Sequence, residues 1–202
     1  MELVVATKNH KKLKEIKEIL KDLDVDIRSL ADFKAVPRIV ENGKSFKENA
    51  IKKAVKIAKF SGKLSLGEDS GLCVHALGGA PGIYSARYSG RDKSDMQNNL
   101  KLLRNLERVP LKERRAYYAC AVALADKDGL LGVVEGRCSG LIGFELKGAR
   151  GFGYDPLFVI PKYNKTFAQL GEKIKHKMSH RYFALEKARK IIQKHIVKQA
   201  LN

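Results

Sequence analysis

The sequence predicts an α/β protein built on a mixed, strongly twisted sheet. The apolar run 3–6 is typical of a short buried strand, and apolar residues at helical spacing follow it directly. Farther along, the β-rich runs 116–125 and 130–138 flank the turn sequence Asp126–Gly129, which predicts a hairpin. Strands that alternate with helices favour parallel pairing, and the hairpin adds an antiparallel pair, so the sheet should be mixed.

Two helices are expected in the first third of the chain. One should run from about residue 10 to 23, because Leu13, Ile16, Leu20 and Leu23 recur at helical spacing. The second should follow Ser45, which forms a capping-box pattern with Glu48. Its inner face is expected to carry small and apolar side chains: Phe46, Ala50, Ala54, Ile57 and Ala58.

The remaining elements follow from shorter signals. They are a strand from 64 to 66 that ends near 68–71, an extended piece at 72–77, a loop at 78–82, a helix with Met96, Leu100 and Leu103 inward that Pro110 ends, and a final helix over 179–199. Neither repeats nor a linker separate these elements, so one domain over 1–202 is expected.

The composition is that of a globular protein with an unusually basic balance. The 202 residues include 40 Lys and Arg against 22 Asp and Glu, and 44% are hydrophobic. The excess lies in two stretches, with net charges of +8 over 8–63 and +7 over 171–202. Such a balance favours a polyanionic partner, although a solvated Lys-rich surface explains it equally well.

Several classes of protein are disfavoured. No apolar run approaches a membrane span, and the N-terminal residues do not resemble a secretory signal, so a cytoplasmic protein without a membrane partner is expected. The three scattered cysteines favour reduced, buried thiols over disulfides or zinc ligands. The tail of a Walker A motif occurs at Gly43-Lys44-Ser45, but Arg38 replaces its first glycine.

Two segments carry charged groups beside predicted strands. Residues 6–12, Ala-Thr-Lys-Asn-His-Lys-Lys, join a strand to a helix, where free N–H groups and lysines suit phosphate. The plainer alternative is an ordinary capped helix start. Glu68-Asp69-Ser70-Gly71 places two carboxylates at an expected strand end, where Mg²⁺ is a suitable partner and Glu41 a third ligand. A polar surface turn is the alternative there.

Two later segments carry aromatic and basic side chains. In Gly151–Pro156 two glycines permit close approach, and Phe152 or Tyr154 could stack on a base. A tight turn with buried aromatics is the alternative. In Lys173–Arg181 the basic side chains are candidate phosphate or base ligands, or merely a solvated loop.

Taken together, the ordered segments are much more specific. ATKNHKK, ENGKSFKENAIKKA, EDSGL, GGAPGIYSARY, GFGYDPLF, KTFAQL and SHR resemble the non-canonical purine NTP pyrophosphatase family, also called the inosine triphosphate pyrophosphatase family. The resemblance extends from Leu3 to about Lys190. It implies a homodimeric, Mg²⁺-dependent hydrolase that converts ITP, dITP and XTP to the monophosphate and pyrophosphate. It also implies a long mixed sheet flanked by helices, with two lobes and a central cleft.

The resemblance assigns roles residue by residue. Asp69 matches the proton acceptor and a metal ligand, with Glu41 and Glu68 as further metal carboxylates. The substrate-binding residues would be Thr7, Lys8, Asn9, His10, Lys11, Lys12, Lys53, Ser70, Phe152, Gly153, Tyr154, Asp155, Lys175, His180 and Arg181. Backbone N–H groups near 152–155 and the His180-Arg181 pair would donate to O6 of the purine.

The sequence departs from the family pattern at two places. Glu68 stands where Asp is usual, and Lys173-Ile174-Lys175-His176 replaces the usual Glu-Glu-Lys-Asn. Two other functions stay open. The charge suggests a nucleic-acid-binding protein, although no basic arm or known binding signature supports nucleic acid as a partner. A pyrophosphatase or kinase acting on the common nucleotides is the second.

Overall fold

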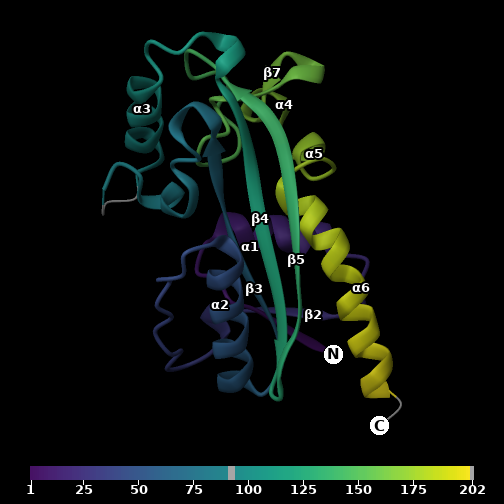
Figure 1. Cartoon of the computed structure of the whole chain (residues 1–202). Helices are drawn as coiled ribbons and strands as arrows, with labels where there is room; N and C mark the ends of the chain where they lie inside the picture. The colour runs from purple at the N-terminus through teal and green to yellow at the C-terminus, as the bar shows by residue number, and fades with distance from the viewer. Residues whose placement is uncertain (91–93, 201–202) are drawn as a thin grey trace. The chain divides into compact units, whose positions relative to one another are not determined.

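The computed structural model describes residues 1–90 and 94–200 and divides the chain into two compact units (Figure 1). Unit 1 comprises Met1–Asp69, Cys120–Gly136 and His180–Asn202, and unit 2 comprises Ser70–Ala119 and Arg137–Ser179. The strands are β1 (Glu2–Val5), β2 (Asp26–Ser29), β3 (Leu64–Val74), β4 (Arg115–Asp126), β5 (Gly129–Ile142), β6 (Phe158–Ile160) and β7 (Lys165–Thr166). The α-helices are α1 (His10–Ile19), α2 (Phe46–Ser61), α3 (Asp95–Asn105), α4 (Phe167–Leu170), α5 (Glu172–Lys175) and α6 (His180–Ala200).

The strands form a mixed sheet in the order β2-β1-β3-β4-β5-β6-β7. β1 pairs in parallel with β2 and β3, whereas β6 pairs antiparallel with β5 and β7. The predicted turn joins β4 to β5, and the Asp126 carboxylate accepts hydrogen bonds from the N–H groups of Asp128 and Gly129. The α/β class and the mixed sheet flanked by helices are therefore confirmed, while the central cleft remains a prediction.

In unit 1 the two faces of the sheet are covered by different helices (Figure 1). Cys120, Val122 and Leu124 of β4 pack with apolar residues of α1 and α6, whereas the intervening alanines of β4 pack against α2. This division follows from the pleat, which points successive side chains of a strand to opposite faces. The small alanines allow α2 to approach the sheet closely.

The approach of α2 is closest at Gly67 of β3. A Cβ atom built there would lie 2.1 Å from the carbonyl oxygen of Ala50 and 2.5 Å from the N atom of Ala54. Both are backbone atoms of α2, so a side chain at Gly67 would push the whole helix away from the sheet. The glycine in the EDSG-containing strand is thus required by packing.

We expect Gly67→Ala to lower the free energy of unfolding by about 1–3 kcal/mol, because the added methyl group overpacks a rigid contact. Urea denaturation followed by circular dichroism measures the change. Gly143→Ala is a matched control, since its Cβ would have its nearest neighbour at 3.5 Å. Equal midpoints for Gly67→Ala and wild type would contradict the packing argument.

Three expected boundaries and one expected face differ from the structure. α1 ends at Ile19 instead of residue 23, and Leu20 and Leu23 are buried just beyond it. β3 continues through Glu68–Gly71, where a strand end was expected. α3 ends at Asn105, well before Pro110, and it exposes Met96 and Leu100 while burying Asn98 and Asn99, whose side chains bond to backbone atoms of unit 2.

Unit 2 has its own apolar core. Leu72, Leu102, Tyr154, Phe158 and Phe167 belong to one buried cluster that joins β3, α3, β6 and α4. The phenyl rings of Phe158 and Phe167 stack with centroids 5.3 Å apart. The three cysteines of the protein are free and buried, as expected.

Candidate active site

The topology of unit 1 places its charged motifs just beyond the carboxyl end of β1 and, in β3, just beyond the segment that pairs with β1. β1 lies between β2 and β3 and is parallel to both, so the chain leaves β1 toward one neighbour and later returns on the other side. Ligands of open α/β sheets bind where the strand order reverses in this way. Thr7–Lys12 follow β1 directly, and Glu68 and Asp69 lie just beyond Leu66, the last residue of β3 paired with β1.

The turn at 7–12 is a capped helix start. The Asn9 side-chain oxygen accepts hydrogen bonds from the N–H groups of Lys11 and Lys12, and Thr7 Oγ1 accepts from the N–H of Asn9. Lys8, Asn9, His10 and Lys11 are exposed. Residues 7–10 also line a pocket of ≈ 410 Å³ together with Leu13 and residues of 29–36. The plainer alternative is thus confirmed, and phosphate binding by the same turn stays a prediction.

Glu68 and Asp69 do not share one site. Because successive strand residues point to opposite faces, the Glu68 side chain contacts α1 and α6, whereas the Asp69 side chain contacts α2. Within residues 1–90 and 94–200, His, Cys, Asp and Glu side chains form no group of three that could hold a metal ion. The side chains of Glu41, Glu68 and Asp69 are therefore not gathered at one point in this structure, and their binding of a metal ion stays a prediction.

The Asp69 carboxylate is buried among polar partners from α2. Lys53 Nζ lies 3.4 Å from Asp69 Oδ1 and 2.6 Å from Glu41 Oε2, and it also donates to the carbonyl oxygen of Glu68. Asn49 Nδ2 donates to Asp69 Oδ2 at 3.0 Å. Lys53 is buried rather than solvated, and its ammonium bridges two of the three predicted metal carboxylates.

Burial decides the protonation behaviour of this group. It raises the pKa of Asp69 above the ordinary value, since it outweighs the opposing effects of the Lys53 and Lys12 ammonium groups. For Lys53 burial alone would lower the pKa, but Asp69 and Glu41 outweigh it and raise the pKa. Asp69 is therefore a carboxylate moved toward the range of a general base, beside a cation that stays charged.

The opposite face of β3 holds a second buried network. Arg181 is 1% exposed, and its Nε and Nη2 atoms donate to the two oxygens of Glu68 at 3.2 and 3.1 Å, while Nη1 donates to Glu15. Lys12 Nζ lies 3.3 Å from Glu68, and the Cys120 thiol points to the same carboxylate. Burial lowers the pKa of Arg181, but Glu68 and Glu15 outweigh it and raise it, so the guanidinium stays charged.

Sequence reasoning missed two polar residues of unit 1. Asn49 bridges the loop after Glu41 to the carboxylate, because its Oδ1 accepts from the N–H of Gly43 while its Nδ2 donates to Asp69. Its position four residues before Lys53, beside the alanine face of α2, is the signal that could have revealed it. Glu15 lies next to Ile16 on the buried face of α1, where a charged side chain needs a partner.

In unit 2 the predicted base-binding turn is tightly held. Asp155 Oδ2 accepts from the N–H of Phe152 at 2.9 Å and from Lys175 Nζ at 2.7 Å. The ammonium also lies 4.5 Å from the centroid of the Phe152 ring, a cation–π distance. A Cβ at Gly151 would lie 2.1 Å from the Asp155 carboxylate, so this position accepts only glycine.

The same contacts restrict what the turn can offer a base. The N–H groups of Phe152, Gly153 and Asp155 already donate to protein oxygens. The expectation that they donate to O6 of the purine therefore finds no support in these three groups. Tyr154 is buried, its hydroxyl donates to the carbonyl oxygen of Ser85, and burial raises the pKa of its phenol. Phe152 is half-buried, so it is the aromatic candidate with an accessible ring.

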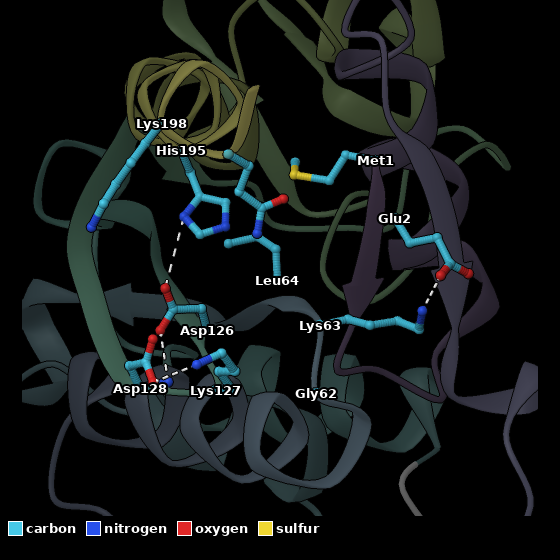
Figure 2. A pocket seen from close by; sticks show the side chains of 11 residues that line it. Met1, Glu2, Gly62, Lys63, Leu64, Asp126, Lys127, Asp128, His195 and Lys198 are labelled. Carbon is cyan, nitrogen blue, oxygen red and sulfur yellow. Dashed lines mark hydrogen bonds and ion pairs between the residues drawn. The ribbon is translucent and has the colours of Figure 1, made fainter. Parts of the chain in front are cut away.

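The other assigned residues lie in different surroundings. Ser70 is half-buried in β3 of unit 2, and His180 is a buried residue at the start of α6 in unit 1. A further pocket of unit 1, lined by Glu2, Lys63, Asp126 and His195 among others, contains none of the assigned residues (Figure 2). The predicted site is thus distinct from the pocket at the β4–β5 turn.

Comparisons with known proteins agree with this architecture. Residues 3–191 match the Ham1 family. A dITP/XTP pyrophosphatase of Desulforamulus reducens is 47% identical over 199 residues, which is 98% of this chain and 99% of the relative. One from Desulfotalea psychrophila is 49% identical over 183 residues, 91% of this chain and 81% of the relative.

Solved structures are similar over nearly the whole chain. The Staphylococcus aureus Ham1 protein aligns with a TM-score of 0.86 and 38% identity, covering 96% of this chain and 100% of that one. A HAM1 protein from Coxiella burnetii gives a TM-score of 0.87 and 38% identity, covering 96% and 99%. The protein is thus an α/β protein of the pyrophosphatase class that the resemblance indicated. The chain belongs to the Ham1 family.

Proposed function

We propose that the protein hydrolyses ITP, dITP and XTP to the nucleoside monophosphate and pyrophosphate, which removes these nucleotides from the precursor pool. Family membership and the names of the relatives, dITP/XTP pyrophosphatases, support the proposal. The observation that carries it is the buried Asp69 carboxylate with raised pKa, fixed by Asn49 and Lys53 just beyond the paired segments of β1 and β3.

Asp69 is proposed as the general base. It takes a proton from a water molecule whose oxygen forms a bond to the α-phosphorus, while the bond from that phosphorus to the bridging oxygen breaks and pyrophosphate leaves. Asn49 fixes the orientation of the carboxylate, and the Lys53 ammonium attracts the negatively charged phosphates. Lys8, Lys11 and Lys12 at the start of α1 are proposed to bind the same triphosphate, with Thr7, Asn9 and His10 shaping the turn.

Mg²⁺ is proposed as the metal. Glu41 and Asp69 fit a cation, because both carboxylates already converge on one positive atom, Lys53 Nζ, and carboxylate oxygens are the ligands that Mg²⁺ prefers. When bound, the ion would neutralise charge on the leaving pyrophosphate. In this structure both carboxylate oxygens of Glu68 accept hydrogen bonds from Arg181. Binding of the metal ion by Glu68 therefore stays a prediction.

The purine is proposed to bind at the turn 152–155. Phe152 would stack on the base, with its ring held by Lys175 and Asp155. Ser70, Gly153, Tyr154, His180 and Arg181 complete the proposed substrate-binding set. Because the N–H groups of Phe152, Gly153 and Asp155 have protein acceptors, we place selectivity for a 6-oxo group on side chains instead of these donors.

The oligomeric state and the cellular location are proposed from membership of the Ham1 family. We infer a homodimer of a single two-lobed domain over 1–202 that acts in the cytoplasm on a small nucleotide, with neither nucleic acid nor membrane as a partner. Among the helices of residues 1–90 and 94–200, none is long and apolar enough to cross a membrane. Size-exclusion chromatography with light scattering measures the oligomeric state.

The proposed reaction is tested by pyrophosphate release from ITP, XTP, dITP, GTP and ATP, each with and without Mg²⁺. We expect inosine and xanthosine substrates to exceed ATP in kcat/KM by at least about a hundredfold, the discrimination a site matched to substrate polar groups achieves. Equal rates for all five nucleotides would contradict the proposal and favour a general pyrophosphatase. Release of orthophosphate instead of pyrophosphate would exclude cleavage between the α- and β-phosphates.

A further inference from the structure

The two peptide groups that flank Gly153 are both bound by α3. The Gly153 N–H donates to Asp95 Oδ2 at 2.8 Å, and the Gly153 carbonyl oxygen accepts from Asn99 Nδ2 at 2.8 Å. Asp95 and Asn99 are one helical turn apart, so they lie on the same side of α3. All of these residues belong to unit 2.

The clamp is anchored within α3 itself. Asn99 is 3% exposed, and its amide also donates to the carbonyl oxygen of Asp95 at 2.8 Å. Its Oδ1 is buried without a hydrogen-bond partner among the described residues. Leaving a buried acceptor unsatisfied costs free energy, and the two hydrogen bonds that the Asn99 NH₂ group donates offset this cost. One of these two hydrogen bonds is to Gly153.

The space beside the Cα atom of Gly153 is open, so close packing does not hold this residue in place. Gly153 has a φ of +62°, and a Cβ built there would meet no atom within 4 Å. The preceding residue, Phe152, is fixed by Asp155 through its N–H and by Lys175 through its ring. The following residue, Tyr154, is fixed by its hydroxyl on Ser85. Gly153 links these two anchored residues, and α3 fixes that link by binding the N–H and the carbonyl oxygen of Gly153.

We infer that Asp95 and Asn99 are positioning residues for purine selectivity. They act through the N–H and the carbonyl oxygen of Gly153, and thereby set the position of the Phe152 ring relative to the rest of the turn. This inference rests on the proposed function, because it assumes that the turn receives the base. Neither residue takes part in the bond-breaking step, so their effect should depend on the base and not on the triphosphate.

The test compares Asp95→Ala with Asp95→Asn in the full chain. Asp95 is exposed, so the alanine variant should fold. We expect Asp95→Ala to lower kcat/KM for ITP about tenfold, mainly through KM, and to lower the ratio of kcat/KM for ITP to that for ATP by a similar factor. Asp95→Asn keeps an oxygen acceptor for the Gly153 N–H and should recover most of both values.

Glu107→Ala is the matched control, because Glu107 is also an exposed acid beside α3 in unit 2 and its N–H donates to the carbonyl oxygen of Arg104 instead of to the turn. It should leave both values unchanged within about twofold, the range of ordinary surface substitutions. An unchanged ratio of ITP to ATP in Asp95→Ala would overturn the inference, whether or not the rates fall. Wild-type protein that releases no pyrophosphate from any purine triphosphate would instead overturn the proposed function.

Discussion

Asp69→Asn should lose almost all turnover while it retains nucleotide binding. The carboxamide has the shape of the carboxylate and can still accept from Asn49, but it does not take a proton from water. General-base catalysis contributes about 10²–10⁴-fold, so we expect kcat to fall by about a thousandfold. Pyrophosphate release under single-turnover conditions measures the chemical step, and a titration with ITP measures binding.

The pH dependence of the wild type gives an independent test of the same residue. A base must be deprotonated to act, so kcat/KM should fall as the pH drops through the pKa of Asp69. Burial raises the pKa of Asp69 in the metal-free protein and a bound cation opposes that rise, so the acid limb should move to lower pH as the Mg²⁺ concentration increases. Asp69→Asn should lack the limb.

Asp24→Asn, an exposed substitution of the same type in unit 1, serves as the control. It should match wild type in rate and in pH profile. A kcat for Asp69→Asn within threefold of wild type would remove Asp69 from the chemistry.

The start and the buried face of α2 are predictable from the sequence, because the residues that decide them are close together along the chain. Ser45 caps α2 by accepting from the N–H of Glu48, as the pattern predicts. The Glu48 carboxylate accepts a hydrogen bond from the backbone N–H of Lys44. A complete capping box would require it to accept from the backbone N–H of Ser45. The alanine spacing of α2 gives its buried face, because helical periodicity depends on neighbours in the sequence.

The strand at 64–74 shows why its full length and the partners of its buried carboxylates could not be predicted from the sequence. Glu68, Asp69 and two flanking glycines are typical of a turn, yet β3 continues through them. The charges are tolerated in a buried strand because their partners come from distant parts of the chain. Arg181 is 113 residues from Glu68, and Lys53 is 16 from Asp69. Such pairings are tertiary, so no spacing within the strand reveals them.

The same reasoning explains the face of α3. Apolar Met96 and Leu100 suggested the inner face, but buried Asn98 and Asn99 take that position. Their amides satisfy backbone groups of the loops near Ser89 and Gly153, which a helical pattern does not show. Asn residues next to the apolar positions of a helix can therefore indicate its buried face, because their amides can satisfy the peptide groups of a neighbouring loop.

The largest loss of stability is expected for Arg181→Met. The guanidinium is a shared partner of Glu68 and Glu15, both nearly fully buried, and Lys12 Nζ also lies 3.3 Å from Glu68 Oε1. Removing one partner of a buried ion pair typically costs about 3–5 kcal/mol, because the other charge is left without compensation. Chemical denaturation of the wild type and the variant measures this difference in the free energy of unfolding.

The carboxylates supply the test of that cause. If uncompensated charge destabilises Arg181→Met, then adding Glu15→Gln and Glu68→Gln should restore a large part of the loss, since neutral amides need no cation. Glu186→Gln, a half-buried acid on α6 that pairs with Arg189 and not with Arg181, is the control substitution and should restore nothing in the Arg181→Met background. A triple variant no more stable than Arg181→Met would show that Arg181 contributes through packing of its side chain. Arg181 would then be a structural residue of α6 whose charge is incidental to the stability of unit 1.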